Sequence, residues 1–397
     1  MKNLWRIFQS EFKNMMTDKG SMLVMVLGIF MYSLFYTIPF STHILREVPL
    51  GVVDFDNSSF SREFIRNLDS NEFIKVTSEP IDIDAAKEEY YRDKIKSFIV
   101  IPKGFEKDIL RGGHSFITSY EDSAFLIIYK QVATGIITTA TSFGAKIEIG
   151  SLMKKGLSKQ QAISMKLPFE FVDMPLYNPV SSYQNYLYPI VLILILQQTM
   201  LIGAGILGGT LKERLKGCKE WSKDGAVEVK SDKVNEFSDN PIEIVFGKSL
   251  AYTSIYTVYT LIYFLIPPAF LVYDMSYNII PMILLFLPFL FATAFLGQLL
   301  VFFYTGRESS LMALVVTSVP LIFLPGFVWP TESIPFGLLV FSKFMPATPA
   351  INGLIKINQM GASFWQVQGD FWLLVGLCVL YFFLACLVVK RMQKKVK

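Results

Sequence analysis

One group of oxygen donors in this chain of 397 residues is Asp54, Asp56, Asn57 and Ser58. Oxygen donors at alternating positions are typical of a calcium loop, which also needs a central Gly and a bidentate Glu near its end. Here Ile65 occupies the position of that Glu, and no Gly is in register. We therefore predict that these residues form a turn at the end of a strand and cap the following helix.

Other patterns that carry chemistry are absent from the sequence. It contains no Gly-x-x-x-x-Gly-Lys-Ser/Thr segment and so has no nucleotide-cradling loop of its own. The only histidines, His43 and His114, do not have the spacing of metal ligands, and no Cys pair supports a zinc site. No Ser or Cys has a convincing His partner either. We predict no catalytic residue, no metal site and no cofactor bound directly.

Six long apolar runs without Asp, Glu, Lys or Arg decide the fold class. Each has about the 20 residues that a helix needs to cross a hydrocarbon core, and none alternates like a barrel strand. The composition agrees, because 52% of the residues are hydrophobic and only 18% are charged. The runs cover residues 21–40, 186–208, 249–273, 279–305, 309–328 and 371–389.

The basic residues beside these runs predict how the chain crosses the membrane. They gather before the first run, after the second, between the fourth and fifth, and at the end of the chain. By the positive-inside rule these segments face the cytoplasm, which places both termini inside and requires an even number of crossings. Residues 41–185 are rich in Lys but lie outside, because long translocated segments are exempt from the rule.

We predict a polytopic α-helical membrane protein with six transmembrane helices and an extracytoplasmic α/β domain between the first and second. The transmembrane helices are expected at 20–41, 186–208, 248–273, 279–305, 309–328 and 371–390. The other segments are an amphipathic cytoplasmic interface helix at 1–19, the periplasmic domain at 42–185, a cytoplasmic coupling loop at 209–247, an outer segment at 329–370 and a basic tail at 391–397.

Strand and helix patterns alternate in the outer domain. A Thr- and Ser-rich stretch at 132–145 is too short for a further crossing, which would also put the basic tail on the wrong side. Strands are expected at 50–55, 72–77, 97–102 and 115–121, helices at 60–68, 83–93 and 105–111, and one or two long helices at 124–165.

The polar groups inside the predicted crossings are amides and hydroxyls. Gln197, Gln198 and Gln298 are the amides, and no ionisable residue accompanies them. A proton- or sodium-coupled carrier commonly keeps an ionisable group at this depth, so the energy for transport would come from elsewhere. Gln197 and Gln198 either line a pathway or pair across a two-fold axis, or they hydrogen-bond between helices.

Three pairs of segments carry a resemblance to a known family. They are GVVDFDNSSFSREFIRNL (51–68) with SFIVIPKGFEKDILRGG (97–113), GGTLKERL (208–215) with NPIEIVFGKSLAY (240–252), and PGFVWPTESIPF (325–336) with FMPATPAINGLIKINQMGASFWQV (344–367). With one crossing before a large outer domain and five after it, the chain resembles the type-2 permease subunits of ABC exporters in bacterial inner membranes.

The resemblance implies a homo- or heterodimer of permeases on two separate ATP-binding subunits, which hold the ATP and Mg²⁺. It also implies that the inner loop forms the coupling helix, although a polar insert at 216–239 separates its halves here. Carried over to this sequence, the coupling residues are Gly209, Thr210, Glu213, Pro241, Glu243, Gly247 and Lys248. The re-entrant outer segment contains Trp329, Pro330, Glu332 and Pro335.

In this interpretation, closure of the ATP-binding subunits moves the amphipathic helix and the inner loop together. A cavity at the dimer interface then opens outward. Such a cavity is apolar and aromatic with few polar groups, which favours an amphipathic, lipid-like or drug-like substrate. Alternatively, Tyr256, Tyr259 and Tyr263 only pack against other helices or lie at the membrane–water interface. The residues predicted to line the path are Gln197, Gln198, Thr199, Tyr256, Tyr259 and Tyr263.

Three other classes of function compete with an exporter. A secondary carrier is disfavoured by the uncharged crossings and by the lack of an internal repeat. A membrane anchor or receptor that displays the outer domain would need only one crossing. An integral membrane enzyme lacks a catalytic constellation. The sequence leaves open whether a periplasmic adaptor docks on the outer domain, and it predicts membrane lipid but no nucleic acid as a partner.

Overall fold

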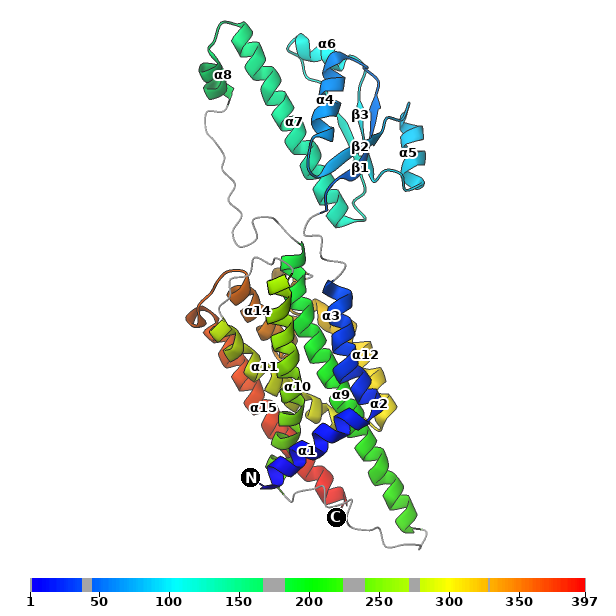
Figure 1. Ribbon diagram of the computed structural model, residues 1–397, viewed down its shortest axis with the longest axis vertical. Coiled ribbons are helices and arrows are strands. Elements are labelled where there is room, and N and C mark those ends of the chain that lie inside the picture. Colours follow the sequence, from blue (N-terminus) through cyan, green and yellow to red (C-terminus); the bar gives the residue numbers. More distant parts are fainter. Residues whose placement is uncertain are drawn as a thin grey trace. The chain divides into compact units, whose positions relative to one another are not determined.

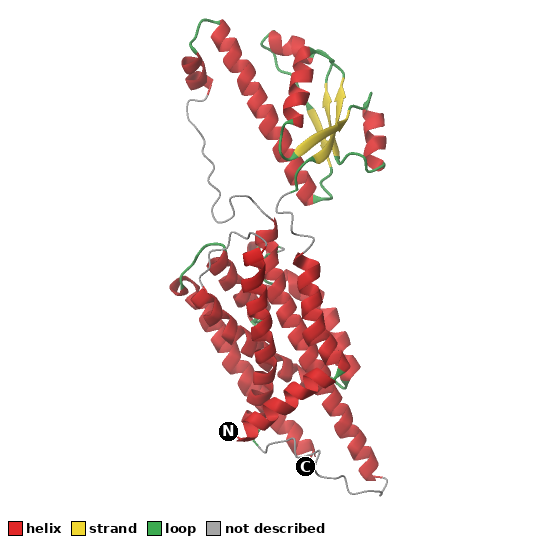
Figure 2. Ribbon diagram, in the orientation of Figure 1, coloured by secondary structure: helices red, strands yellow, loops and turns green. Residues whose placement is uncertain are grey.

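The computed structural model describes residues 2–37, 45–166, 183–223, 240–270, 279–327 and 329–396. The chain divides into two compact units. A helical unit comprises Met1–His43 and Pro175–Lys397, and an α/β unit comprises Ile44–Met174. The sheet lies in the α/β unit, whereas the helical unit consists of helices and their connections (Figure 2).

The α/β unit contains a four-stranded sheet in the order β2-β1-β3-β4. β1 pairs in parallel with β2 and β3, and β4 runs antiparallel to β3. The strands are β1 (Val48–Asp54), β2 (Ile74–Ser78), β3 (Ser97–Ile101) and β4 (Thr118–Glu121). The helices are α4 (Ser59–Asp69), α5 (Ile83–Tyr91), α6 (Phe105–Leu110), α7 (Leu126–Lys154) and α8 (Lys159–Lys166).

Both faces of this sheet are covered by helices (Figure 1). One face packs against α4 and α7 through a core that includes Phe64, Ile99 and Phe143, and the other packs against α5. The central strands β1 and β3 are therefore buried on both faces, which explains why their sequences read as continuous apolar runs. The predicted strands and helices of this unit are confirmed, and the long helical region forms two helices.

The predicted turn after β1 is also confirmed. Asp54 Oδ1 accepts the backbone N–H groups of Asp56 at 2.9 Å and Asn57 at 3.0 Å. Ser58 caps α4 by accepting the N–H of Ser61 at 3.1 Å, and Ser61 Oγ accepts the N–H of Ser58 at 2.9 Å. The segment 132–145 lies within α7, where Val132, Ile136 and Phe143 face the sheet.

The helical unit is a bundle around α9. Its helices are α1 (Lys2–Thr17), α2 (Lys19–Met22), α3 (Ile29–Thr37), α9 (Tyr183–Lys223), α10 (Pro241–Phe270), α11 (Ile279–Leu300), α12 (Arg307–Phe323), α13 (Phe336–Lys343), α14 (Ala347–Asn358) and α15 (Phe364–Val396). A π-helical stretch, η1 (Leu23–Gly28), joins α2 to α3, and the 3₁₀ turns η4 (Val301–Phe303) and η5 (Thr331–Ser333) follow α11 and precede α13. The main core gathers side chains from α9, α10, α11 and α14.

α1 lies across one end of the bundle, against α10 (Figure 1). Ile7, Glu11 and Met15 recur at intervals of four residues and are buried, whereas Trp5 is 58% exposed. This spacing places one face of α1 on the bundle and leaves the other open. The chain then bends by 81° before α2, η1 and α3 continue along the bundle.

Helix covers most of the described residues in each of the six apolar runs, but the number of crossings stays a prediction. Within the described residues, three helices are long and apolar enough to span a membrane: Tyr186–Arg214, Ile280–Phe303 and Phe364–Gln393. Two helix pairs bent by 81° raise this number to five if each pair is one span: Asn3–Thr17 with Lys19–Tyr32, and Phe336–Lys343 with Ala347–Asn358. α12 has 17 residues and ends two residues before Pro325.

Two helices extend beyond the membrane-spanning segments expected from the sequence. α9 does not end at 208 but continues to Lys223, so the first part of the expected loop 209–247 is helix. The cause is its sequence, because LKERLK consists of strong helix formers. α15 begins at Phe364, seven residues before the expected start at 371, after Ser363 donates its N–H to Gln366 Oε1 at 2.7 Å. The insert 216–239 lies largely outside the described residues.

Candidate functional site

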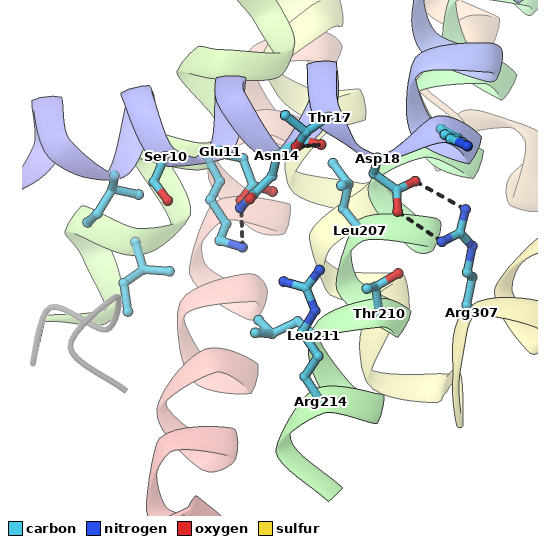
Figure 3. Close-up of a pocket in the computed structure, with 14 residues that line it drawn as sticks. Ser10, Glu11, Asn14, Thr17, Asp18, Leu207, Thr210, Leu211, Arg214 and Arg307 are labelled. Atoms are coloured by element: carbon cyan, nitrogen blue, oxygen red, sulfur yellow. Dashed lines mark hydrogen bonds and ion pairs between the residues drawn. The ribbon is translucent and has the colours of Figure 1, made fainter. Parts of the chain in front are cut away.

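A cavity of about 630 Å³ lies where α1 crosses the bundle, and we call it the polar pocket (Figure 3). Its walls come from α1, α2, α9, α10 and the first residue of α12, so it joins segments that are far apart in the sequence. The lining residues are Ile7, Ser10, Glu11, Asn14, Thr17, Asp18, Lys19, Leu207, Thr210, Leu211, Arg214, Ile244, Lys248 and Arg307.

One wall of the polar pocket is held by an ion pair between α1 and α10. The side chain of Glu11 is only 4% exposed, and its Oε2 lies 3.0 Å from Lys248 Nζ. Its other oxygen, Oε1, accepts a hydrogen bond from the buried Tyr252 hydroxyl. A carboxylate at this depth needs such partners, because an unpaired buried charge is strongly destabilising.

A second set of contacts joins the bend after α1 to the start of α12. Asp18 caps α2, and its Oδ1 accepts the N–H of Ser21 at 2.8 Å. Its two oxygens also bind the guanidinium of Arg307 in a bidentate pair, at 2.9 and 3.1 Å. The backbone N–H of Arg307 in turn donates to Glu213 Oε1 of α9 at 2.6 Å. α2, α9 and α12 therefore meet at Arg307.

The helices approach closely around this junction. A Cβ atom at Gly209 would lie 2.7 Å from the backbone N and Cα of Arg307, so only glycine fits here. A Cβ at Gly247 would lie 2.9 Å from Cγ2 of Ile7 in α1. Lys212 caps the C-terminal end of η4, which follows α11. Its Nζ donates to three backbone carbonyls between Val301 and Tyr304 at 2.6 to 3.0 Å.

Most of the expected coupling residues lie at or beside the polar pocket. Thr210 and Lys248 line it, Glu213 and Gly209 contact the start of α12, and Gly247 packs on α1. Pro241 and Glu243 lie apart from the lining, in the first turn of α10, where Asn240 Oδ1 accepts the N–H of Ile242 at 3.1 Å.

Sequence reasoning missed Glu11, Asp18, Arg214 and Arg307 as pocket residues. A signal for the first two was present, because they are the only acidic residues before the first apolar run. In the sequence, Arg307 stands out only as the basic residue between the fourth and fifth apolar runs. Its pairing with Asp18 joins positions 289 residues apart, which no local pattern indicates.

The tyrosines expected along a substrate path form hydrogen bonds between helices. The hydroxyl of Tyr259 donates to the carbonyl of Val26 at 2.9 Å, and that of Tyr263 donates to the carbonyl of Ile29 at 2.5 Å. These bonds attach α10 to η1 and α3. Tyr256 OH donates to Oγ1 of Thr199 in α9 at 3.0 Å.

The glutamines have different surroundings. Gln298 Nε2 donates to the Val245 carbonyl and to Ser249 Oγ, at 3.1 and 2.6 Å, so it hydrogen-bonds between helices. Gln197 Oε1 accepts the N–H of Ala347 at 2.7 Å. Gln197 Nε2 and both amide atoms of Gln198 are buried and have no hydrogen-bond partner among the described residues.

The four residues expected in a re-entrant segment precede α13, which forms with α14 a helix pair bent by 81°. Pro330 and Pro335 immediately precede η5 and α13, and Glu332 lies in η5. Trp329 and Pro335 line a second, apolar cavity of about 610 Å³, whose other walls come from α9, α11, α12 and α13. α14 is buried against α9, α11 and α15.

Ion pairs and close backbone contacts join α1, α2, α9, α10 and α12 at this end of the bundle. Within the described residues, no group of three or more His, Cys, Asp or Glu could hold a metal ion. The polar pocket has instead the cations and hydrogen-bond donors that suit contact with an anionic group.

Comparison with known proteins places the chain in a family. Residues 19–387 match the family model described as an ABC-2 family transporter protein. A search among curated proteins finds no match. The match to the family model spans nearly the whole sequence, including both compact units. The chain therefore belongs to the ABC-2 family, whose members are membrane-embedded permeases of ABC transporters that work with an ATP-binding partner subunit.

Proposed function

We propose that this chain is the membrane-spanning permease subunit of an ATP-driven exporter and that force from ATP hydrolysis enters it near the polar pocket. Family membership supports the permease and its ATP-binding partner. The observation that carries the proposal is the meeting of Glu213, Lys248, Arg307 and α1 at one end of the bundle. A push on α9 or α10 there reaches α1 and α12 through ion pairs and backbone contacts.

In this proposal the polar-pocket end of the helical unit faces the cytoplasm. Both termini of the chain lie at that end (Figure 1). The basic segments near 2–19, 212–223, 307 and 390–397 belong to the same end of the helices, which supports this orientation by the positive-inside rule. The α/β unit then follows the first crossing and lies in the periplasm of a bacterial inner membrane.

We further propose that two permeases pair to form the path and that two ATP-binding subunits supply ATP and Mg²⁺. The buried amide atoms of Gln197 and Gln198 without partners support a path beside the middle of α9, because such groups are costly unless a second copy or a ligand satisfies them. The apolar and aromatic surroundings support an amphipathic, lipid-like or drug-like substrate.

Reconstitution with the ATP-binding subunit tests the coupling. The complex should hydrolyse ATP, and Glu213→Ala and Glu243→Ala should each lower its turnover at least about tenfold if they transmit force, a loss of about 1.4 kcal/mol. Glu79→Ala, at an exposed position of the α/β unit, is the control and should leave the turnover unchanged. Equal loss in all three variants, or in none, would contradict the proposed entry point.

Reporter fusions after Lys223 and Lys397 test the orientation. Both should report a cytoplasmic location, whereas a fusion within 155–158, between α7 and α8, should report the opposite side. A split between the first two fusions would rule out the even number of crossings.

Mass spectrometry of the purified complex tests the proposed path. A co-purifying amphipathic ligand should be lost with Gln198→Leu and kept with Gln298→Leu. Gln298 is the matched control, because its amide already bonds to protein groups in α10. Retention in both variants would place the path elsewhere.

A further inference from the structure

The polar pocket contains more positive charge than its own carboxylates neutralise. Four basic residues line it, Lys19, Arg214, Lys248 and Arg307, against the two acidic residues Glu11 and Asp18. Both carboxylates are already paired, Glu11 with Lys248 and Asp18 with Arg307. Within the described part of the chain, Lys19 and Arg214 form no ion pair.

These two cations reach the lining of the cavity from different helices, α2 and α9. Lys19 follows the bend at Asp18, and Arg214 belongs to α9. Figure 3 shows the Arg214 guanidinium pointing from α9 toward α1, into the space below Asn14. Asn14 adds an amide to the lining, whereas the hydroxyls of Thr17 and Thr210 donate to backbone carbonyls of their own helices. Cations and an amide N–H together are groups that bind a phosphate.

The volume of the polar pocket fits such a ligand. At about 630 Å³ it falls within the range of small-molecule sites. Its lining is not wholly polar, because Ile7, Leu207, Leu211 and Ile244 contribute apolar wall. The site therefore suits a phosphate group that is attached to an apolar body better than a free anion.

An exposed apolar stripe begins beside Lys19 and indicates what that body is. Met22 and Leu23 lie three and four residues after Lys19, on the same helix face, and Leu27 follows four residues later. They are 45%, 57% and 45% exposed. In a membrane-embedded protein, such a stripe faces acyl chains, while the Lys19 ammonium extends to the headgroup level.

We propose that the polar pocket binds the phosphate headgroup of an anionic phospholipid, with Lys19 and Arg214 as its two cationic contacts and the stripe of Met22, Leu23 and Leu27 against its acyl chains. The bound lipid would link α2 to α9 through its phosphate. This proposal requires family membership but not the proposed exporter activity, and its test uses no substrate and no ATP.

Binding of short-chain lipids to the purified full-length protein in detergent tests the proposal. Dioctanoyl phosphatidylglycerol should bind more tightly than dioctanoyl phosphatidylcholine, which has no net charge. Glycerol 3-phosphate, which has the phosphate without acyl chains, should compete weakly. Lys19→Gln and Arg214→Gln should each weaken phosphatidylglycerol binding about fivefold, and the double variant about 25-fold, from about 1 kcal/mol per charge.

Control variants distinguish specific binding in the pocket from attraction to general surface charge and from effects of misfolding. Lys13→Gln removes an exposed charge from α1 outside the pocket lining and should leave the affinity unchanged. Lys19→Arg and Arg214→Lys should retain binding within about twofold, and all variants should unfold at the wild-type temperature, because neither residue forms an ion pair.

Four results would overturn the proposal. Equal affinity for the two lipids would show that the net charge of the headgroup plays no part. An equal loss of affinity with Lys13→Gln would show that the binding depends on general surface charge and not on the pocket. Glycerol 3-phosphate binding as tightly as phosphatidylglycerol would assign the site to a soluble phosphate compound. Unchanged lipid binding in the double variant, with loss of the co-purifying ATP-binding subunit, would assign it to an acidic segment of that subunit.

Discussion

Single residues at the polar pocket differ in how much they depend on their partners. Glu11 is enclosed by protein, whereas the side chain of Lys248 is 21% exposed and can still reach water. The cost of breaking this pair therefore depends on which charge is left behind. A carboxylate left alone in the interior is far more costly than an ammonium at its edge.

We predict that Lys248→Met destabilises the protein more than Glu11→Gln. The first variant leaves a buried charged Glu11 and should cost about 3–5 kcal/mol in unfolding free energy, whereas the second keeps an acceptor for Tyr252 and should cost less. Unfolding of the purified protein in detergent measures both. The double variant should recover part of the loss, and the reverse order of the two single variants would contradict this account.

Asp56 gives the α/β unit a dependence on pH. Its Oδ1 accepts the N–H of Gly104 at 2.7 Å and its Oδ2 that of Glu106 at 3.0 Å, at the start of α6. Desolvation raises the pKa of Asp56, but hydrogen bonds from Ser58 and from the backbone of 104–106 outweigh it and lower the pKa below its usual value. A lowered pKa stabilises the fold above the unfolded value of about 3.9, and this stabilisation is lost as the pH falls through the folded value.

Hydrogen exchange in α6, corrected for the intrinsic rate, should therefore increase when the pH falls below about 4. Asp56→Asn should lower the free energy of opening α6 by about 1 kcal/mol at pH 7 and remove this acid dependence. Glu79→Gln, at an exposed position in the same unit, is the control and should keep the wild-type profile. An acid response that survives in Asp56→Asn would assign the effect to another group.

At the scale of elements, close contacts fix how the helices meet near the polar pocket. α9 lies against the start of α12 at Gly209, where no side chain fits. This contact is between backbones and cannot yield by the rotation of a side chain. The bend between α1 and α2 is fixed differently, by the Asp18 cap and its pair with Arg307.

We predict that Gly209→Ala separates α9 from α12 and costs about 1–3 kcal/mol, as overpacking does elsewhere. Gly376→Ala in α15 is the matched control, because a Cβ there meets no atom within 4 Å. Alanine should stabilise that helix by up to about 1 kcal/mol. Thermal unfolding distinguishes the two variants, and equal shifts would mean that the contact at Gly209 carries no strain.

Local sequence patterns predicted the helices and strands well, but they predicted poorly which of these contact one another. Ser58 and its turn could be predicted, because a cap depends on its neighbours in sequence. The buried strand β3 could be predicted from a continuous apolar run. The junction of Asp18, Arg307 and Glu213 could not, because it depends on helices that meet only after folding. The end of α9 at Lys223 could not be predicted from hydropathy, because polarity marks where an apolar run ends, not where a helix does.

At the scale of the whole molecule, the two units have separate cores. The α/β unit buries Phe64, Ile99 and Phe143 in one cluster and Val53 and Phe98 in another, all within its own residues. A unit of this size with a sheet covered on both faces has enough core to fold alone.

Residues 44–174 expressed alone should therefore unfold in one cooperative transition, as measured by circular dichroism. Phe64→Ala should lower the unfolding free energy by about 3–5 kcal/mol, because Phe64 is fully buried. An exposed position, Ile81→Ala, should change it little. A gradual, non-cooperative loss of signal in the isolated unit would show that it needs the helical unit to fold.

The uninterrupted course of α9 has a mechanical consequence. Its 41 residues run as a helix from Tyr183 to Lys223, which at 1.5 Å per residue is a rod about 60 Å long with Pro189 in its second turn. If this rod tilts by about 10° around one end, the opposite end sweeps through about 10 Å. A small angular adjustment near Arg214 would thus become a large displacement at Tyr183, without any helix having to melt.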